Sequence, residues 1–146
     1  MAEDMEDDVA ALPAAEFGFP GELRDRLVAV ILSGEKTSTT GLLAAYEVEG
    51  EALPEVGSRS AVVDSAGRPV AVIEITGVRV VPFGEVDLAH AADEGEGDTS
   101  LDTWRASHER FFHSAPMREV LGDPEFAVTD ATPVVLERFR LVARLD

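Results

Sequence analysis

Hydrophobic residues recur at helical intervals in several stretches of the chain. Between Leu23 and Ser33 one helical face carries Leu23, Leu27, Val30 and Ile31, and Gly34 is placed to end the helix. In a later and longer stretch, Thr99 and Asp102 provide an N-cap signal ahead of the apolar positions, and Pro116 is expected to close the helix. Further helical segments are predicted over residues 44–48, 84–93 and 117–121.

Other apolar runs are typical of strands. Residues Ser60 to Asp64 and Pro69 to Val81 are joined by the short turn SAGR, and the second run is apolar on both faces, as in a buried strand. Thr132 to Ala143 predicts a last strand. The segment from Lys36 to Leu43, KTSTTGLL, is rich in β-branched threonine and indicates a strand or an extended turn.

The order of these elements predicts the fold class. Strands that are largely segregated from helices indicate an α+β domain, and about five short strands around a small core favour a compact barrel. Residues 1–17 are acidic, rich in alanine and without periodicity, so we interpret them as a flexible leader. Residues 18–146 then form one domain.

The net charge of the chain limits the kinds of binding partner that are expected. The chain has 29 acidic and 12 basic residues, a net charge of -17, and six of the acids lie in the first sixteen residues. Because long nucleic acids bind largely through clustered basic side chains, nonspecific binding of long DNA or RNA is not expected. A small nucleoside, or one RNA loop held at a local basic spot, remains compatible with this charge.

Location and redox chemistry follow from what the sequence lacks. There is no cysteine, which excludes disulfides, thiolate metal sites and cysteine nucleophiles. The N-terminus is acidic where a targeting peptide would be basic, and no apolar run approaches the roughly 20 residues of a membrane span. We therefore expect a cytoplasmic protein without membrane contact.

The basic residues are eleven arginines and a single lysine, Lys36. A lysine can lose its proton in a protein and an arginine cannot, so this position is a candidate for an amine with a chemical role. The alternative is that Lys36 survived by chance and only caps the preceding helix through its dipole. The histidines at 90, 108 and 113 do not share a ligand spacing and are expected to be surface or packing residues. No metal or other cofactor is predicted.

Two motifs together carry a family resemblance. The pattern GxKxxT is present as Gly34, Lys36 and Thr39, and EGEGDTSLDTWRASH follows at residues 94–108. With the strands between them, these motifs resemble the ASCH domain family, relatives of the RNA-binding PUA fold. The resemblance implies a PUA-like small β-barrel with flanking helices, whose cleft accepts a nucleobase or a nucleoside.

The resemblance also implies an activity. Some family members are amidohydrolases that remove the acetyl group from N4-acetylcytidine with a lysine, a threonine and a glutamate, and others bind or cleave RNA. Lys36 and Thr39 match the first two positions, and the glutamate is Glu96 or, as the next choice, Glu94. Candidate substrate-binding residues are Ser38, Tyr46, Ser100, Trp104 and Arg105.

The chemistry of this set suggests a metal-independent hydrolysis of an amide. A desolvated Lys36 could take the proton of Thr39, which would attack the acetyl carbonyl while Ser38 or backbone N–H groups stabilise the oxyanion. A neighbouring glutamate could instead hold the proton or guide water. Two alternatives remain open: a noncatalytic RNA-binding module, and RNA cleavage by Lys36 with Tyr46 or Ser100.

Overall fold

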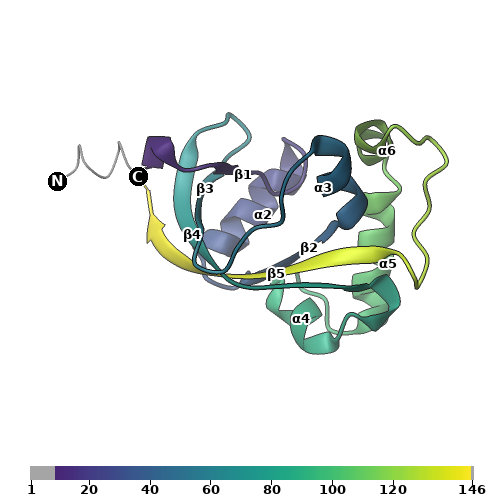
Figure 1. The fold of residues 1–146 in the computed structure, drawn as a ribbon. Helices are drawn as coiled ribbons and strands as arrows, with labels where there is room; N and C mark the ends of the chain where they lie inside the picture. The colour runs from purple at the N-terminus through teal and green to yellow at the C-terminus, as the bar shows by residue number, and fades with distance from the viewer. Residues whose placement is uncertain (1–8, 146) are drawn as a thin grey trace.

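The computed structural model describes residues 9–145, and in this part of the chain five strands form one mixed sheet. The strand order is β1-β3-β4-β5-β2, and the sheet curls into a half-barrel with helices around it (Figure 1). The predicted α+β class and PUA-like architecture are confirmed. The strands are β1 (Ala14–Ala15), β2 (Ser38–Leu42), β3 (Arg59–Val63), β4 (Pro69–Pro82) and β5 (Pro133–Arg144).

The two long strands, β4 and β5, hold the sheet together and bend it. They pair antiparallel along almost their whole length, and the register shifts between Val72 and Ile73 and again between Ile75 and Gly77. Such irregularities insert an extra residue in one strand and increase its bend and twist. The bends curl the sheet, and β2 and β3 pair antiparallel on either side of this central pair.

Helices flank the sheet on both faces. Their bounds are α2 (Glu22–Leu32), α3 (Leu43–Glu49), α4 (Leu88–Asp93), α5 (Leu101–Phe112) and α6 (Ala115–Leu121), with a 3-10 turn η1 (Phe83–Glu85). No helix within residues 9–145 combines the length and the apolar character that crossing a bilayer requires. The predicted cytoplasmic location remains a prediction.

Three helix boundaries differ from those predicted. Ser100, and not Thr99, caps α5, because its hydroxyl accepts the N–H of Thr103. Pro116 does not close α5, which ends at Phe112; it lies in the first turn of α6, where proline is well tolerated. The helix predicted over 84–93 is divided into η1 and α4, because Asp87 adopts an extended conformation and caps α4.

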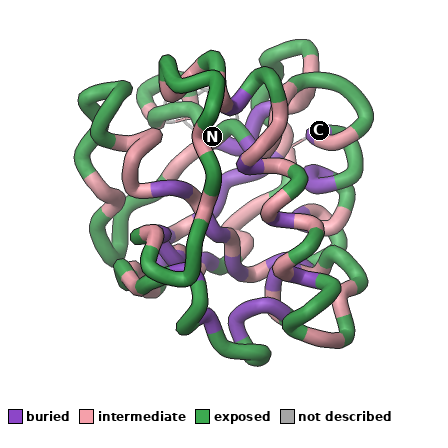
Figure 2. The backbone as a smooth tube through the Cα atoms, turned by 90° about the vertical axis from the view of Figure 1, so that its right-hand side faces the viewer, coloured by how far each residue is buried: buried purple, intermediate pink, exposed green. Residues whose placement is uncertain are grey.

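The sheet separates two hydrophobic clusters. Alternate residues of a strand face opposite sides, and β5 accordingly gives Phe139 to one cluster and Leu136 to the other. The first cluster packs α2 against the inner face of the curl, and the second packs α5 against the outer face. In Figure 2 most of the buried segments lie toward the inside of the molecule, with exposed segments around them.

Part of the predicted leader belongs to the fold. Ala14 and Ala15 pair in parallel with Ala61 and Val62 of β3. Phe17 is 9% exposed and packs in the first cluster against Phe139. Ala14 is exposed and Ala15 is half-buried, so their place in the fold rests on backbone pairing with the edge of β3, whereas Phe17 is held by the apolar inner face. Residues 1–8, also assigned to the leader, lie outside the described residues.

Replacing Phe112 tests the second cluster. The ring is 0% exposed and contacts the rings of Phe83, Phe111 and His108. We expect Phe112→Ala to lower the free energy of unfolding by about 3–5 kcal/mol, the usual cost of removing a buried aromatic ring. Urea denaturation measures this, with Leu101→Ala on the exposed first turn of α5 as the control that changes little. Similar values for the two variants would contradict the assignment of the core.

Candidate functional site

The ammonium group of Lys36 is enclosed in the protein. The residue is 2% exposed. Its Nζ donates to the carbonyl oxygen of Ser38 at 2.9 Å, to Oε2 of Glu96 at 3.1 Å and to the carbonyl oxygen of Glu94 at 3.4 Å. An ammonium carries three donors and no acceptor, so three acceptors use all its hydrogens. The arrangement is that of a buried, protonated lysine.

The loop that carries the two glutamates is placed by Gly95. This residue has a φ of +69°, and a Cβ on it would lie 2.6 Å from the carbonyl group of Glu35. Only glycine fits this close approach of two backbones and the left-handed conformation together. The loop therefore lies directly against the chain before β2, and the carboxylates of Glu94 and Glu96 lie 3.9 Å and 3.1 Å from Nζ of Lys36.

Glu94 is the anchor of the site. It is 1% exposed, and five side chains surround its carboxylate: Thr40, His90, Trp104, His108 and Lys36. Oε2 accepts from the hydroxyl of Thr40 at 2.7 Å and from Nε1 of Trp104 at 2.9 Å, while Oε1 contacts Nε2 of His108 at 2.9 Å. Lys36 Nζ lies 3.9 Å from Oε1. Burial alone would raise the pKa of Glu94, but the hydrogen bond from His108 and the charges of His108 and Lys36 hold it well below its usual range.

His108 is held as an imidazolium. Its Nδ1 lies 2.8 Å from the carbonyl oxygen of Trp104, and its Nε2 faces the Glu94 carboxylate. Both neighbours are acceptors, so both ring nitrogens must carry hydrogens. Burial opposes the charge, but the Glu94 carboxylate outweighs it and raises the pKa of His108. The ring of Trp104 stacks on the imidazole with centroids 4.1 Å apart.

His90 has the opposite protonation. The single hydrogen of the Thr40 hydroxyl goes to Glu94, so Thr40 accepts a hydrogen from Nε2 of His90 at 2.9 Å. Nδ1 of His90 is buried without a hydrogen-bond partner. A hydrogen there would be an unpaired buried donor, which is costly, so His90 is neutral.

Glu96 forms the accessible end of the site. Its side chain is 23% exposed, whereas those of Lys36 and Glu94 are each 1% exposed. Burial and the nearby charge of Glu94 raise its pKa, although the charge of Lys36 opposes this. The two glutamates thus differ in protonation and in access to solvent. Glu94 is fixed as an anion, and Glu96 is the carboxylate that can exchange a proton with solvent.

The formal charges of the four ionised side chains in this cluster sum to zero. His108 and Lys36 supply two positive charges, and Glu94 and Glu96 supply two negative ones. Donor atoms of Glu94, Glu96 and His108 lie within 4.8 Å of one another, the spacing of a metal site. However, both nitrogens of His108 are committed to hydrogen bonds as donors, and an ammonium already sits beside both carboxylates. As arranged, these groups do not fit a cation.

Thr39 lies on the other face of β2 from Ser38 and Thr40. It pairs directly with Glu137 of β5 and so shares the side of the sheet that carries α2. Its hydroxyl makes no hydrogen bond to Lys36, Glu94 or Glu96 within residues 9–145. The predicted role of Thr39 as a nucleophile activated by Lys36 remains a prediction.

The candidate substrate-binding residues are dispersed. Ser38 is 0% exposed and donates its only hydroxyl hydrogen to the carbonyl of His90, so it has none for an oxyanion. Trp104 is 2% exposed and offers no free face to a base. Ser100 caps α5, and Arg105 pairs with Glu109 and Asp130.

Tyr46 lies on the inner face of the sheet, where its hydroxyl donates to Glu137. Two hollows are found elsewhere on the described surface. One of about 650 Å³ is lined by His113 and α6, and one of about 370 Å³ lies beside Pro82 and Asp130. Neither includes a residue of the Lys36 cluster.

Three members of the cluster were not predicted from the sequence, namely Thr40, His90 and His108. His90 and His108 were expected to be surface or packing residues, but both are buried hydrogen-bonding partners of the site. Sequence spacing offered two signals that could have pointed to them. Thr40 lies on the same face of β2 as Ser38, and His108 follows Trp104 by one helical turn. Neither pattern reveals that a loop from elsewhere brings a carboxylate between them.

The chain has a half-barrel α+β fold, and comparisons with known proteins agree with this fold. The family model of the ASCH domain matches residues 14–143. Protein EF3133 from Enterococcus faecalis V583 is 28% identical, with a TM-score of 0.79 over 97% of this chain and 85% of that one. The ASCH domain from Lactobacillus crispatus JV V101 is 30% identical, with a TM-score of 0.77 over 97% and 86%. No curated protein matches.

The chain belongs to the ASCH domain family. The resemblance seen in the GxKxxT motif and the acidic loop is therefore confirmed at the level of the family.

Gly95→Ala should damage the site selectively. A methyl group at this position meets the backbone of Glu35 and Lys36, which cannot move aside as a flexible side chain can. We expect a loss of roughly 1–3 kcal/mol in the free energy of unfolding. The matched control is Gly97→Ala, which has a φ of +87° but open space around it. Equal losses in urea denaturation would show that the close approach at Gly95 is unimportant.

The buried charges predict a defined dependence of stability on pH. Because the pKa of His108 is raised above its usual 6.5, its contribution is complete below pH 6.5 and is lost as pH rises through the folded-state value. Because the pKa of Glu94 is lowered, its contribution is complete above its usual 4.5 and is lost as pH falls through the folded-state value.

Stability from these two groups is therefore greatest between about pH 4.5 and 6.5. Urea denaturation at a series of pH values measures it, and His108→Gln should remove most of the decline on the alkaline side. An unchanged decline in that variant would contradict the assignment of a charged His108.

Proposed function

We propose that this ASCH-domain protein binds a small pyrimidine nucleoside and hydrolyses an amide on its base, with N4-acetylcytidine as the substrate to test. The observation that carries the proposal is the pairing of a buried ammonium with a partly exposed carboxylate, Lys36 with Glu96, at 3.1 Å. Perturbed ionisable groups gathered at one place are typical of acid–base sites. The net charge of -17 supports a small neutral substrate over a long polyanion.

In the proposed step, Glu96 takes a proton from a water molecule while the water oxygen attacks the acetyl carbonyl carbon. The oxyanion that forms is stabilised by the ammonium of Lys36, which turns toward it as Glu96 releases its hydrogen bond. The protonated Glu96 then gives its proton to the amide nitrogen as the carbon–nitrogen bond breaks. Cytidine and acetic acid result, and the acid ionises to acetate.

This assignment follows from the protonation of the site. Lys36 has no free lone pair where it lies, because three acceptors surround its Nζ, so it is suited to stabilise an anion and not to remove a proton. Glu94 is held by Thr40, Trp104 and His108 and cannot approach a substrate. Glu96 is the carboxylate left with access to solvent.

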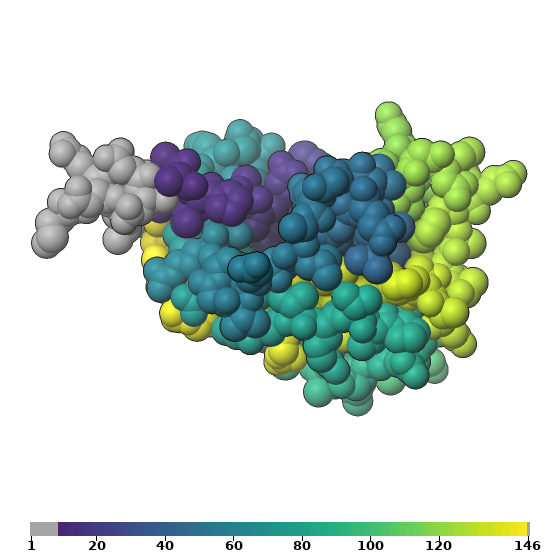
Figure 3. All heavy atoms as spheres, in the orientation of Figure 1, coloured from purple at the N-terminus to yellow at the C-terminus, as the bar shows by residue number. Residues whose placement is uncertain are grey.

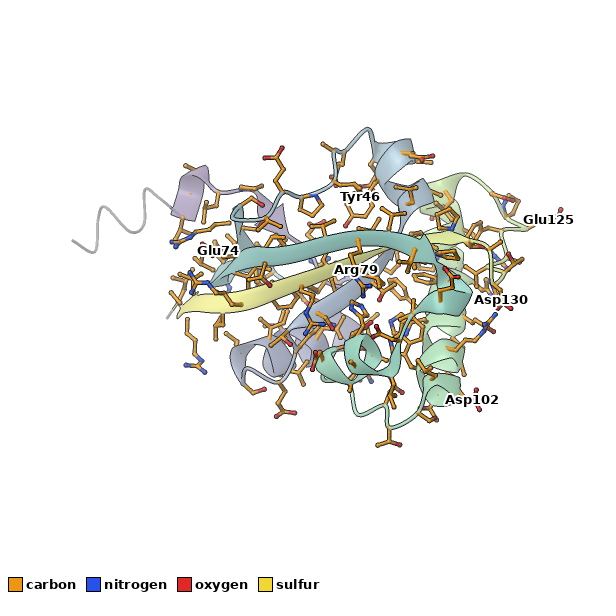
Figure 4. All side chains as sticks on the ribbon, turned by 60° about the horizontal axis from the view of Figure 1, so that its bottom comes forward. Tyr46, Glu74, Arg79, Asp102, Glu125 and Asp130 are labelled. Carbon is orange, nitrogen blue, oxygen red and sulfur yellow. The ribbon has the colours of Figure 1, made fainter. Side chains whose placement is uncertain are left out.

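Acetate release from N4-acetylcytidine tests the proposal. We expect the purified protein to release acetate and cytidine, and Glu96→Gln to slow the reaction by roughly 10²–10⁴-fold, the usual contribution of general acid–base catalysis. The control is Glu125→Gln, an exposed acid in the loop after α6 that should keep full activity (Figure 4). Thermal unfolding confirms that both variants fold. Release no faster than without protein, or equal release by Glu96→Gln, removes the proposal.

The variant Thr39→Val distinguishes attack by the Thr39 hydroxyl from attack by a water molecule. If Thr39 were the nucleophile, as the sequence motif suggested, the acetyl group would pass transiently to its hydroxyl and the variant would be inactive. In the route through water, kcat persists in this variant.

A further inference from the structure

A carboxylate occupies the middle of the sheet where an apolar side chain is expected. Glu137 lies in β5, which has β4 on one side and β2 on the other. Its neighbours on the same face, Val135 and Phe139, are 0% and 4% exposed. Acidic residues are rarely placed in such rows unless they are paired or have a function.

One oxygen of the Glu137 carboxylate has a hydrogen-bond donor in the described protein, and the other oxygen has none. The hydroxyl of Tyr46 donates to Oε2 of Glu137, and no side-chain or backbone donor within residues 9–145 contacts Oε1. Oε1 is also not among the fully enclosed unpaired atoms, so it reaches solvent. Burial raises the pKa of Glu137, and the positive charge of Lys36 acts on it in the opposite direction. The two residues therefore lie within electrostatic range of each other.

Thr39 lies beside this free oxygen. It is the direct partner of Glu137 in the register of β2 and β5, so both side chains leave the same face of the sheet. Its hydroxyl is also without a protein partner within the described residues. A free acceptor and a free hydroxyl thus stand next to each other on a half-buried surface.

The surface is closed on one side by Tyr46. Its ring packs over Gly41 of β2, where a Cβ would lie 3.4 Å from Cε2 of the ring. Figure 4 shows Tyr46 between α3 and the sheet, and in Figure 3 atoms of β5 are visible between α3 and the segment that contains β4. Because the Tyr46 hydroxyl donates to it, the Glu137 carboxylate lies on the side of the sheet that α3 covers.

We propose that Oε1 of Glu137 and the hydroxyl of Thr39 form a recognition edge for the base of a cytosine nucleoside. Oε1 accepts the N–H on the N4 nitrogen, and the Thr39 hydroxyl donates to N3. The inference rests on the proposed function, since that names the substrate class. It gives Thr39 a role in binding, which agrees with its separation from the Lys36 hydrogen-bond network.

Titrations with cytidine and with N4,N4-dimethylcytidine, which has no N–H at N4, test the edge. Isothermal calorimetry of the wild-type protein should show cytidine binding that is stronger than binding of the dimethylated nucleoside. Glu137→Gln should weaken cytidine binding by roughly ten- to hundredfold, the usual effect of a hydrogen bond to a charged group. The same change should leave binding of the dimethylated nucleoside nearly unaltered, because that contact is already missing.

Two further variants complete the experiment. Thr39→Val should weaken the binding of both nucleosides, since both retain N3, and Glu125→Gln should alter neither. Thermal unfolding of Glu137→Gln serves as the check on folding, because the amide oxygen of glutamine can still accept from Tyr46. Equal affinity of the wild-type protein for the two nucleosides, absence of cytidine binding at millimolar concentration, or unaltered binding by Glu137→Gln would overturn the recognition edge.

The recognition edge and the hydrolysis can fail separately. Glu96→Gln should bind cytidine as the wild-type protein does while losing acetate release. A protein that binds cytidine through Glu137 but releases no acetate would support the edge and remove the catalytic proposal.

Discussion

The ion pair of Lys36 with Glu94 and Glu96 is the interaction on which the rest of this structure depends. An ammonium and two carboxylates are costly to bury, and their burial is tolerated only if charges and hydrogen bonds are matched. Here each group has its partners, and the imidazolium of His108 completes the balance. Removing one member of such a set leaves an unpaired buried charge, which costs about 3–5 kcal/mol.

This constraint explains the elements around the site. The backbone of the 94–98 loop must touch the chain before β2, so Gly95 is needed at the point of contact. The outer face of the sheet must give hydroxyls and not only apolar groups at the end of β2, so Ser38 and Thr40 lie there. The α5 helix contributes Trp104 and His108, one turn apart, which hold opposite oxygens of the same carboxylate.

The two faces of β2 carry different polar groups. On the outer face a closed network fixes the protonation of Glu94 and leaves Glu96 at its accessible end. On the inner face Thr39 and Glu137 keep unpaired polar atoms beside Tyr46. Because neighbouring residues of a strand point in opposite directions, one short segment, KTSTT, can serve both a buried ionic centre and a half-buried surface.

The sequence by itself determined the class of the fold and most of its elements, and it singled out Lys36 as a candidate site residue. These are consequences of local periodicity, of turn residues and of a single lysine among eleven arginines, all of which are visible along one chain. The tertiary structure decided which side chains meet. The carboxylate of Glu94 reaches Thr40 and His108 only because the loop, β2 and α5 pack together, and no local pattern encodes such a contact between distant segments. For the same reason the acids at 94 and 96, alike in sequence, became distinct only when burial and neighbouring charges gave each its own environment.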